Sequence, residues 1–338
     1  MHYLITGHTG FKGAWLSLML IQQGHLVSGI SLDPEVGSLF DRTKLGTYLE
    51  NDIRANILDS AGLKSKFKEI EPDVVIHLAA QALVPESYKN PITTFETNVM
   101  GTLNVIAASQ QLKDLKAQLI ITTDKVYKNT GKISGYVESD EIGGEDPYSA
   151  SKAMADIAAQ SWLISFDNPP TAIARAGNVI GGGDVCAARL MPDLINSYSL
   201  GLTPKLRAPN SIRPWQHVLD CLNGYLLLVD EVILNKADGA WNFGPSIDQA
   251  KSVADVADIA GAAWGAETTW EIDPESHPHE AAILMLNSYK ARTELGWSDK
   301  LTFEESIQWT VDWHKNVDNH SEPLNEMLRN IKEFEARK

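Results

Sequence analysis

Short apolar runs alternate with longer amphipathic stretches through the first half of the chain. The apolar runs predict strands at residues 2–6, 25–31, 73–79, 118–123 and 171–176. The amphipathic stretches predict helices at residues 11–23, 92–110 and 147–167. Because strands that alternate with helices form a parallel sheet covered on both faces, the pattern predicts an α/β fold with a doubly wound parallel sheet.

The second half has a looser pattern. Glycine and proline cluster at residues 181–183, 204–214 and 244–245, and helical patterns recur near 187–200, 218–235, 251–264 and 303–316. We expect a smaller, mixed α/β substrate-binding lobe of about residues 179–212 and 244–338. It would pack on a larger domain of residues 1–178 and about 213–243. The charged tail after about residue 320 is expected to be dispensable.

The composition narrows the class of protein. With 43% hydrophobic and 22% charged residues among 338, the chain has the composition of a globular protein. Its formal net charge of −15 repels nucleic acid and anionic membranes, so a phosphate-bearing ligand needs a local site. No run is long enough for a membrane span or has the pattern of a signal peptide. Cys186 and Cys221 form no motif, and a reducing, cytoplasmic location is expected.

A glycine turn follows the first predicted strand. In LITGHTGFKGAWL, Gly7, Gly10 and Gly13 recur every third residue and lead into a helix. One glycine allows a sharp turn, one lets the backbone approach a pyrophosphate, and one lets the helix pack on the strand. The turn therefore predicts a Rossmann-type site for a dinucleotide.

The second predicted strand lacks the acid that usually binds the ribose hydroxyls. Ser31 takes that position, and Asp33 is either its substitute or a turn former before Pro34. No arginine follows until Arg42, so a 2′-phosphate has no evident partner. NAD is therefore favoured over NADP.

Tyr148 and Lys152 are four residues apart in DPYSASKAMADIAAQSW, hence on one face of a predicted helix. An ammonium beside a phenol favours the phenolate, and a tyrosine with its pKa lowered toward neutrality can take a proton from an alcohol as hydride leaves. A surface pair at helical spacing is the alternative. The hydroxyl-rich strand end QLIITT favours the catalytic interpretation, because a hydroxyl there can orient the same alcohol.

Several segments together resemble the extended short-chain dehydrogenases/reductases, a family of NAD-dependent epimerases and dehydratases. They are GxxGxxG at 7–13, HLAA at 77–80, TNVMGTLNV at 97–105 and the Tyr148/Lys152 pair. The chain is most similar to the branch of the CDP-glucose 4,6-dehydratases, through HTGFKGAWL, HLAAQALV, TTDKVYKN, GYVESDEIGGEDPYSASKA, RAGNVIGGGD, SIRPWQHVLD and HPHEAAILMLNSYKARTELGW.

The resemblance implies a lyase that converts CDP-glucose to CDP-4-keto-6-deoxyglucose with a recycled NAD. Hydride leaves C4, water is lost across C5 and C6, and the hydride returns to C6. Tyr148 would be the base for the C4 hydroxyl, Lys152 would lower the pKa of Tyr148, and Thr123 would hold the C4 oxygen. Asp124 and Lys125 would serve the elimination. Whether Lys125 is a base or stabilises the enolate as an ammonium stays open.

The resemblance also implies binding residues and an assembly. For the cofactor they are Gly7, Gly10, Phe11, Lys12, Gly13, Asp33, Asp52, Ile53, Leu78, Ala79, Ala80, Asn98, Tyr148 and Lys152. For the nucleotide-sugar substrate they are Gln81, Asn178, Arg189, Arg213, His217, His279 and Glu280. A homodimer is expected through residues 92–110 and 147–165. The spacing in SHPHEAA matches no zinc motif, so no metal is expected.

One segment departs from the family. The chain reads DVCAAR where the family usually reads DWxxDR, which keeps Asp184 and Arg189 but leaves base recognition open. Two other functions are considered: a nucleotide-sugar epimerase or dehydrogenase, and a sensor that binds a dinucleotide without chemistry. Asp124 and Lys125 argue against the first, and the Tyr148/Lys152 pair argues against the second.

Overall fold

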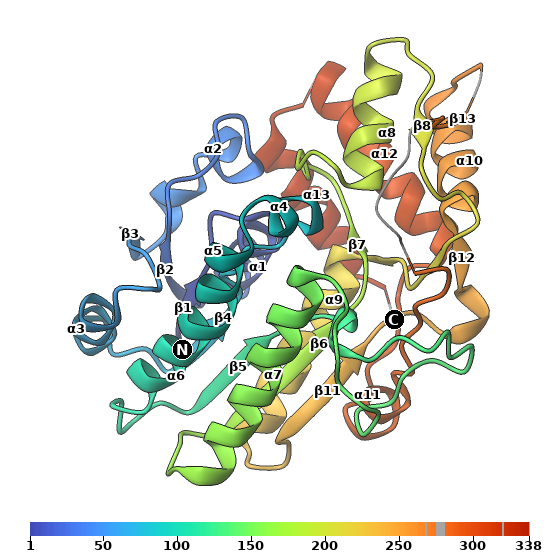
Figure 1. The fold of residues 1–338 in the computed structure, drawn as a ribbon. Helices are drawn as coiled ribbons and strands as arrows, with labels where there is room; N and C mark the ends of the chain where they lie inside the picture. The colour runs from blue at the N-terminus through green and yellow to red at the C-terminus, as the bar shows by residue number, and fades with distance from the viewer. Residues whose placement is uncertain (268, 275–280, 320, 338) are drawn as a thin grey trace.

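A seven-stranded sheet forms the centre of the protein, in the order β11-β6-β5-β4-β1-β2-β3. The computed structural model describes residues 1–267, 269–274, 281–319 and 321–337 (Figure 1). The sheet strands are β1 (His2–Thr6), β2 (Leu26–Ser31), β3 (Asn51–Arg54), β4 (Val74–His77), β5 (Ala117–Ile121), β6 (Thr171–Ala176) and β11 (Gly239–Phe243). Every neighbouring pair is parallel, which confirms the predicted doubly wound fold.

The remaining elements cover the sheet and extend beyond it. The helices are α1 (Phe11–Gln22), α2 (Leu39–Thr43), α3 (Ser60–Ile70), α4 (Val84–Lys89), α5 (Pro91–Phe95), α6 (Gly101–Ser109), α7 (Pro147–Ser165), α8 (Leu190–Ser199), α9 (Val218–Ile233), α10 (Val253–Trp264), α11 (Tyr289–Glu294), α12 (Phe303–Asn319) and α13 (Pro323–Glu335). The short strands are β7 (Val179–Ile180), β8 (Lys205–Leu206), β9 (Ile212–Arg213), β10 (Gln216–His217), β12 (Lys251–Ser252) and β13 (Glu271–Ile272).

Side chains alternate between two helical layers along β1. Tyr3 and Ile5 join the core cluster that contains residues of α1 and α9, and Leu4 joins the cluster that contains residues of α3 and α6. A parallel strand buried on both faces reads as a nearly continuous apolar run, which is why HYLIT is recognisable in the sequence. The carboxyl ends of these strands all lie at one edge of the sheet.

A second core lies beyond that edge. It brings together buried residues of α8, α10 and α12, among them Leu194, Val256 and Ile307. Figure 1 shows these helices gathered near β8 and β13, apart from the helices that flank the sheet. The loops between the two cores supply the remaining wall of the cavity described below.

Two sequence expectations need correction. The tail after residue 320 is not dispensable, because α13 buries Met327, Ile331 and Phe334 in the main core beside α1 and α2. The predicted helix at 92–110 is interrupted, since residues 96–100 form a π-helical turn between α5 and α6. In that turn Asn98 is fully buried.

Candidate active site

A cavity of about 1700 Å³ lies at the carboxyl edge of the sheet. Its walls include the segments that follow β1, β2, β3, β4, β5 and β6, and residues of α8 and the 204–215 and 281–284 loops. Ligands of doubly wound folds bind at this edge, where the strand order reverses. Here the reversal lies between β1 and β4.

The glycine turn forms one end of the cavity. Gly7 has a φ of +81°, and a Cβ there would lie 2.7 Å from the backbone nitrogen of Ala79, so only glycine fits between β1 and the segment after β4. A Cβ on Gly13 would lie 2.3 Å from the Gly7 carbonyl oxygen. Gly10 is the N-cap of α1 and supplies no side-chain cap, so the first N–H groups of the helix face the cavity. Such a helix N-terminus suits a pyrophosphate.

The end of β2 carries hydroxyls in place of an acid. The Ser31 hydroxyl is 2.7 Å from that of Thr9, and Asp33 lines the cavity with an exposed side chain. Arg54, which the sequence analysis overlooked, also reaches this end. It is held by Asp52 at 2.7 Å and lies 3.5 Å from Asp33. Its charge is therefore neutralised by carboxylates.

Asp52 and Ile53 are not part of the cavity wall. Asp52 instead accepts a hydrogen bond from His8 at 2.7 Å as well as from Arg54. The wall at this point is formed by residues 55–58. Asn56-Ile57 and Asp52-Ile53 are both a polar residue followed by isoleucine, so the sequence does not show which pair lies at the cofactor. The position of the cavity favours Asn56-Ile57.

The turn after β5 brings together the predicted catalytic residues. Thr123 Oγ1 donates to Asp124 Oδ1 at 2.9 Å, and Lys125 Nζ lies 3.1 Å from the same oxygen. Lys125 also donates to Asn178 Oδ1 at 3.3 Å, which links the segments that follow the neighbouring strands β5 and β6. Asp124 is fully buried, and its Oδ2 has no hydrogen-bond partner in the part of the chain that is described. Asp124 itself does not line the cavity; at this turn the cavity wall is formed by Thr123 and Lys125.

Tyr148 and Lys152 face this turn from α7. Burial raises the pKa of the Tyr148 phenol to about 12, and the hydroxyl of Thr123 opposes this shift only in part. Lys152 Nζ donates to the Ile121 carbonyl at 3.2 Å. Burial, helped by the charge of Lys12, lowers the pKa of Lys152 to about 8. The sequence pattern predicts a lowered pKa for Tyr148, whereas the surroundings of Tyr148 in this structure raise it.

The remaining cofactor residues lie as a group beside the glycine turn. Phe11, Lys12, Leu78, Ala79 and Ala80 all line the cavity. Asn98 does not; its side chain binds the Gln81 backbone and donates to Ser151 at 2.8 Å, which braces the π-helical turn against α7.

The predicted substrate residues divide into several groups. Gln81, Asn178, Arg189 and Arg213 line the cavity. Gln81 is bound to Thr94 at 2.8 Å and so also has a structural contact. Arg189 lies 3.0 Å from Asp184. These are the two charged residues of the family pattern that the DVCAAR segment retains.

His217 is not at the cavity. It is fully buried, caps α9 by accepting from the Leu219 N–H at 3.2 Å, and its ring packs edge-on to Trp309. Burial lowers its pKa to about 3. His279 and Glu280 lie outside the described residues.

Within the described ranges, no three His, Cys, Asp or Glu side chains gather as a metal ion requires. In the same ranges, no helix is both long and apolar enough to cross a membrane.

Comparison with known families and proteins places the chain among nucleotide-sugar enzymes. Residues 4–310 match the family described as GDP-mannose 4,6 dehydratase. A CDP-glucose 4,6-dehydratase of Salmonella typhimurium is 42% identical over 322 residues, which are 92% of this chain and 89% of the relative. A dTDP-glucose 4,6-dehydratase of the same organism is 26% identical over 343 residues, covering 93% and 92% of the two chains.

Solved structures share the fold. The dTDP-glucose 4,6-dehydratase of Bacillus anthracis in complex with NAD superposes with a TM-score of 0.81 at 23% identity, over 96% of this chain and 99% of that one. A UDP-glucose-4-epimerase of Stenotrophomonas maltophila with bound NAD has a TM-score of 0.83 at 20% identity, over 95% and 100%. At these identities the likeness concerns the fold alone.

Proposed function

The chain belongs to the GDP-mannose 4,6-dehydratase family, and from this premise we propose that it is an NAD-dependent lyase that converts CDP-glucose to CDP-4-keto-6-deoxyglucose and water. The observation that carries the proposal is the meeting of Thr123, the Asp124–Lys125 pair and Tyr148 beside a cavity that also contains the glycine turn. The choice of CDP rests on the similarity to the Salmonella relative.

The cofactor residues support NAD. The backbone around Gly7 and Gly10 would hold the pyrophosphate, and Asp33 at the end of β2 would bind the adenosine ribose. A 2′-phosphate would meet Asp33 and an arginine already paired with Asp52, which disfavours NADP. When bound, NAD supplies the hydride acceptor for C4 and the donor for C6.

Tyr148 would take the proton of the C4 hydroxyl. Thr123, whose hydroxyl lowers the pKa of Tyr148, would hold the same oxygen. A phenol with a pKa raised to about 12 is a poor base, so the site must stabilise the phenolate when substrate is present. Lys152, four residues along α7, carries the charge that would do so.

Asp124 and Lys125 would carry out the elimination. A carboxylic acid beside a neutral amine holds the same number of protons as the carboxylate–ammonium pair, so the two forms interconvert by moving one proton over the 3.1 Å contact. In the first form, Lys125 takes the C5 proton and Asp124 protonates the C6 hydroxyl, which leaves as water. The two residues are then a carboxylate and an ammonium. When hydride returns to C6, the Lys125 ammonium would give a proton back to C5, and the proton that Tyr148 took from the C4 hydroxyl would restore the Asp124 carboxylic acid.

The proposal includes the arrangement of the chain. Residues 1–178 with about 213–243 would hold NAD, and about 179–212 with 244–338 would hold the sugar nucleotide. We further propose that the enzyme is cytoplasmic, where its free Cys186 and Cys221 remain reduced.

We also propose a homodimer formed through residues 92–110 and 147–165, which include residues of α5 and the whole of α7, two helices in contact with each other. Large apolar side chains are exposed on or near this pair: Tyr88, Ile92, Met100, Met154, Ile157, Ile164 and Phe166. Large apolar side chains exposed on neighbouring helices indicate a protein interface. Ile157→Asp should convert a dimer to a monomer in light scattering; a monomeric wild-type chain would contradict the proposal.

Incubation with CDP-, UDP- and dTDP-glucose tests the activity. The NAD-loaded protein should convert CDP-glucose best, with a 4-keto sugar detected by its alkaline absorbance. If UDP-glucose or dTDP-glucose is converted faster than CDP-glucose, the protein belongs to another branch of the family. A 4-epimer without water loss would indicate an epimerase, and no product from any of the three would overturn the proposal.

A further inference from the structure

The turn that carries Thr123, Asp124 and Lys125 is held at both of its ends by one buried ion pair. Before the turn, Thr122 Oγ1 donates to Asp156 Oδ2 at 2.9 Å. After the turn, the Tyr127 hydroxyl accepts from Arg175 Nη1 at 2.8 Å. Asp156 and Arg175 are themselves joined by two hydrogen bonds of 2.9 and 2.7 Å.

These side-chain contacts hold the chain where the backbone hydrogen bonds of the sheet end. The last paired residue of β5 is Ile121, and Thr122 N–H still donates to the Ala174 carbonyl at 2.8 Å. Beyond it, residues 124–126 form a single 3₁₀ turn, in which the Val126 carbonyl accepts from the Gly143 N–H at 2.8 Å. A turn this short depends on such contacts and on anchoring side chains for a fixed position.

Asp156 has no unused hydrogen-bonding capacity. Its Oδ2 accepts from Thr122 and from Arg175 Nε, and its Oδ1 accepts from Arg175 Nη2 and from Gln160 Nε2 at 2.6 Å. The Asp156 and Arg175 side chains are 0% and 1% exposed. The Asp156 carboxylate therefore has no site left for a ligand.

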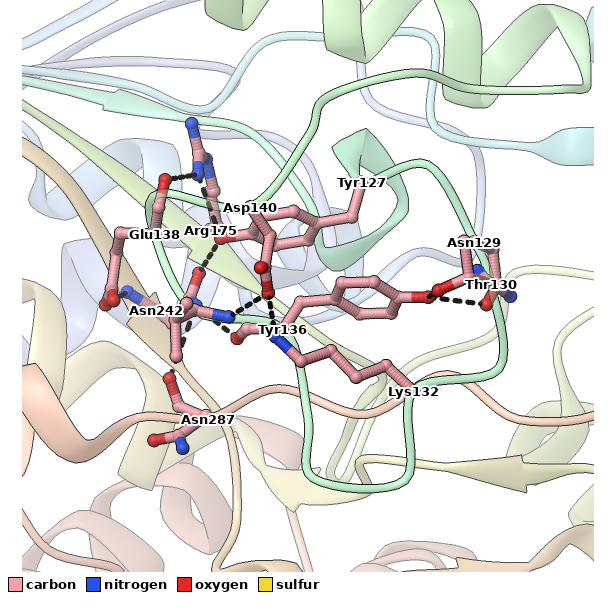
Figure 2. Close-up of polar contacts among 11 residues, drawn as sticks. Tyr127, Asn129, Thr130, Lys132, Tyr136, Glu138, Asp140, Arg175, Asn242 and Asn287 are labelled. Carbon is pink, nitrogen blue, oxygen red and sulfur yellow. Dashed lines mark hydrogen bonds and ion pairs between the residues drawn. The ribbon is translucent and has the colours of Figure 1, made fainter.

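The anchoring continues past the turn to β11. Arg175 Nη1 also donates to the Glu138 carbonyl at 3.0 Å, and the Tyr127 hydroxyl donates to Asn242 Oδ1 at 2.7 Å. Figure 2 shows Arg175 and Asn242 converging on the Tyr127 hydroxyl, while the Tyr136 ring lies against the Tyr127 ring with its own hydroxyl turned toward Asn129 and Thr130. The Tyr127 hydroxyl is thus fixed from two strands.

Stability alone does not account for such a pair. Desolvating two charges costs about as much as their attraction returns, and apolar replacements of buried ion pairs are often neutral or stabilising. What an ion pair provides that apolar packing does not is direction, because each bond fixes an angle as well as a distance. The directions fixed here are those of Thr122 and Tyr127.

We propose that Asp156 and Arg175 are positioning residues, which fix the Thr123–Lys125 turn relative to Tyr148 and Lys152. The link to the second pair is α7 itself, since Tyr148, Lys152 and Asp156 are spaced by four residues along one face of the helix. One ion pair thus sets the position of both groups of catalytic candidates. The inference rests on the proposed function for its catalytic consequence, but the anchoring of the turn is testable without it.

Variants of the two end residues test the inference, because removing either charge leaves the other buried and endangers folding. Thr122→Val and Tyr127→Phe each delete one hydroxyl and keep the shape. Thr122→Ser keeps the hydroxyl, and Tyr136→Phe is a matched control that deletes a neighbouring phenol whose bonds do not reach the turn. All four are first checked for folding by near-ultraviolet circular dichroism.

The first measurement is backbone hydrogen exchange in a peptide covering residues 121–128. Exchange should be faster in Thr122→Val and Tyr127→Phe than in the wild type, Thr122→Ser and Tyr136→Phe. Equal exchange in all five proteins overturns the inference, whether or not CDP-glucose is the substrate.

The second measurement is turnover of CDP-glucose. We expect kcat to fall about ten- to hundredfold in Thr122→Val and Tyr127→Phe with KM nearly unchanged, since small misplacements of catalytic groups have effects of this size. Thr122→Ser and Tyr136→Phe should retain the wild-type kcat. Faster exchange with unchanged kcat would overturn the positioning role. An inactive wild type would count against the proposed function only, because the exchange result stands on its own.

Discussion

On the sheet side of the cavity, Thr123, Tyr148 and Lys152 come from a strand end and a 19-residue helix, whereas Arg189 and Arg213 opposite come from a loop and a two-residue strand. The first side is fixed by the backbone hydrogen bonds between parallel strands and by buried side-chain hydrogen bonds. The second is fixed by short pairings, such as that of β9 with β12 over two residues, and by the Asp184–Arg189 ion pair. We infer that the sheet side sets the rate of the chemical steps and the opposite side sets affinity.

Tyr148→Phe tests the sheet side most severely. Loss of the phenol removes the proposed base, so kcat should fall about 10³-fold while KM changes little. Steady-state kinetics with CDP-glucose checks this, with Tyr289→Phe, an exposed tyrosine on α11 away from the cavity wall, as the control. A Tyr148→Phe variant that keeps most of its kcat would remove this residue as the base.

Lys125→Met separates the two chemical steps on the same side. Oxidation at C4 should proceed, seen as the absorbance of reduced cofactor on adding substrate, while product formation falls about 10²-fold. Lys125→Arg is the informative partner, because it keeps the charge and cannot act as a base. Activity retained in Lys125→Arg would favour the electrostatic role, and equal loss of oxidation and elimination in Lys125→Met would contradict the division of labour.

The contrast between the two sides also explains what the sequence could predict. Buried parallel strands are continuous apolar runs, and the glycine turn and the Tyr148/Lys152 spacing are local, so the sheet and much of its edge were readable. β3 and β11 were not predicted, since NDIR is half-polar and GAWNF follows a loop.

Residues that act through distant contacts were hidden. His217 in SIRPWQHVLD looked like a ligand because the motif does not reveal that its ring caps α9 and faces Trp309. The Asp156–Arg175 pair joins residues 19 positions apart, from a helix and a strand, and neither lies in a recognisable spacing. Only the packing of α7 on the sheet makes such contacts visible.

Lys152 offers a test of how much the burial of a charged residue on the sheet side lowers the free energy of unfolding. Its pKa falls from 10.5 in the unfolded chain to about 8 in the folded chain, so between these values the unfolded chain binds more protons. Stability should therefore rise with pH over this window, by at most about 3 kcal/mol for this residue. Urea unfolding of the wild type and Lys152→Met at both ends of the window measures it, with the exposed Lys68→Met as control. Parallel pH dependences in all three proteins would contradict the burial effect.

Arg189→Ala tests the opposite side and should have the smallest effect. The Arg189 guanidinium is partly exposed and contacts Asp184 at 3.0 Å beside the cavity. Losing one charged contact to the substrate should raise KM roughly tenfold, a cost typical of hydrogen bonds to charged groups, and leave kcat within about twofold. Arg189→Lys should recover part of the affinity, because it restores the charge without the planar fork. Calorimetric binding of CDP gives the same comparison without turnover. A fall in kcat at constant KM would place Arg189 with the chemistry, and the separation of rate and affinity between the two sides would no longer hold.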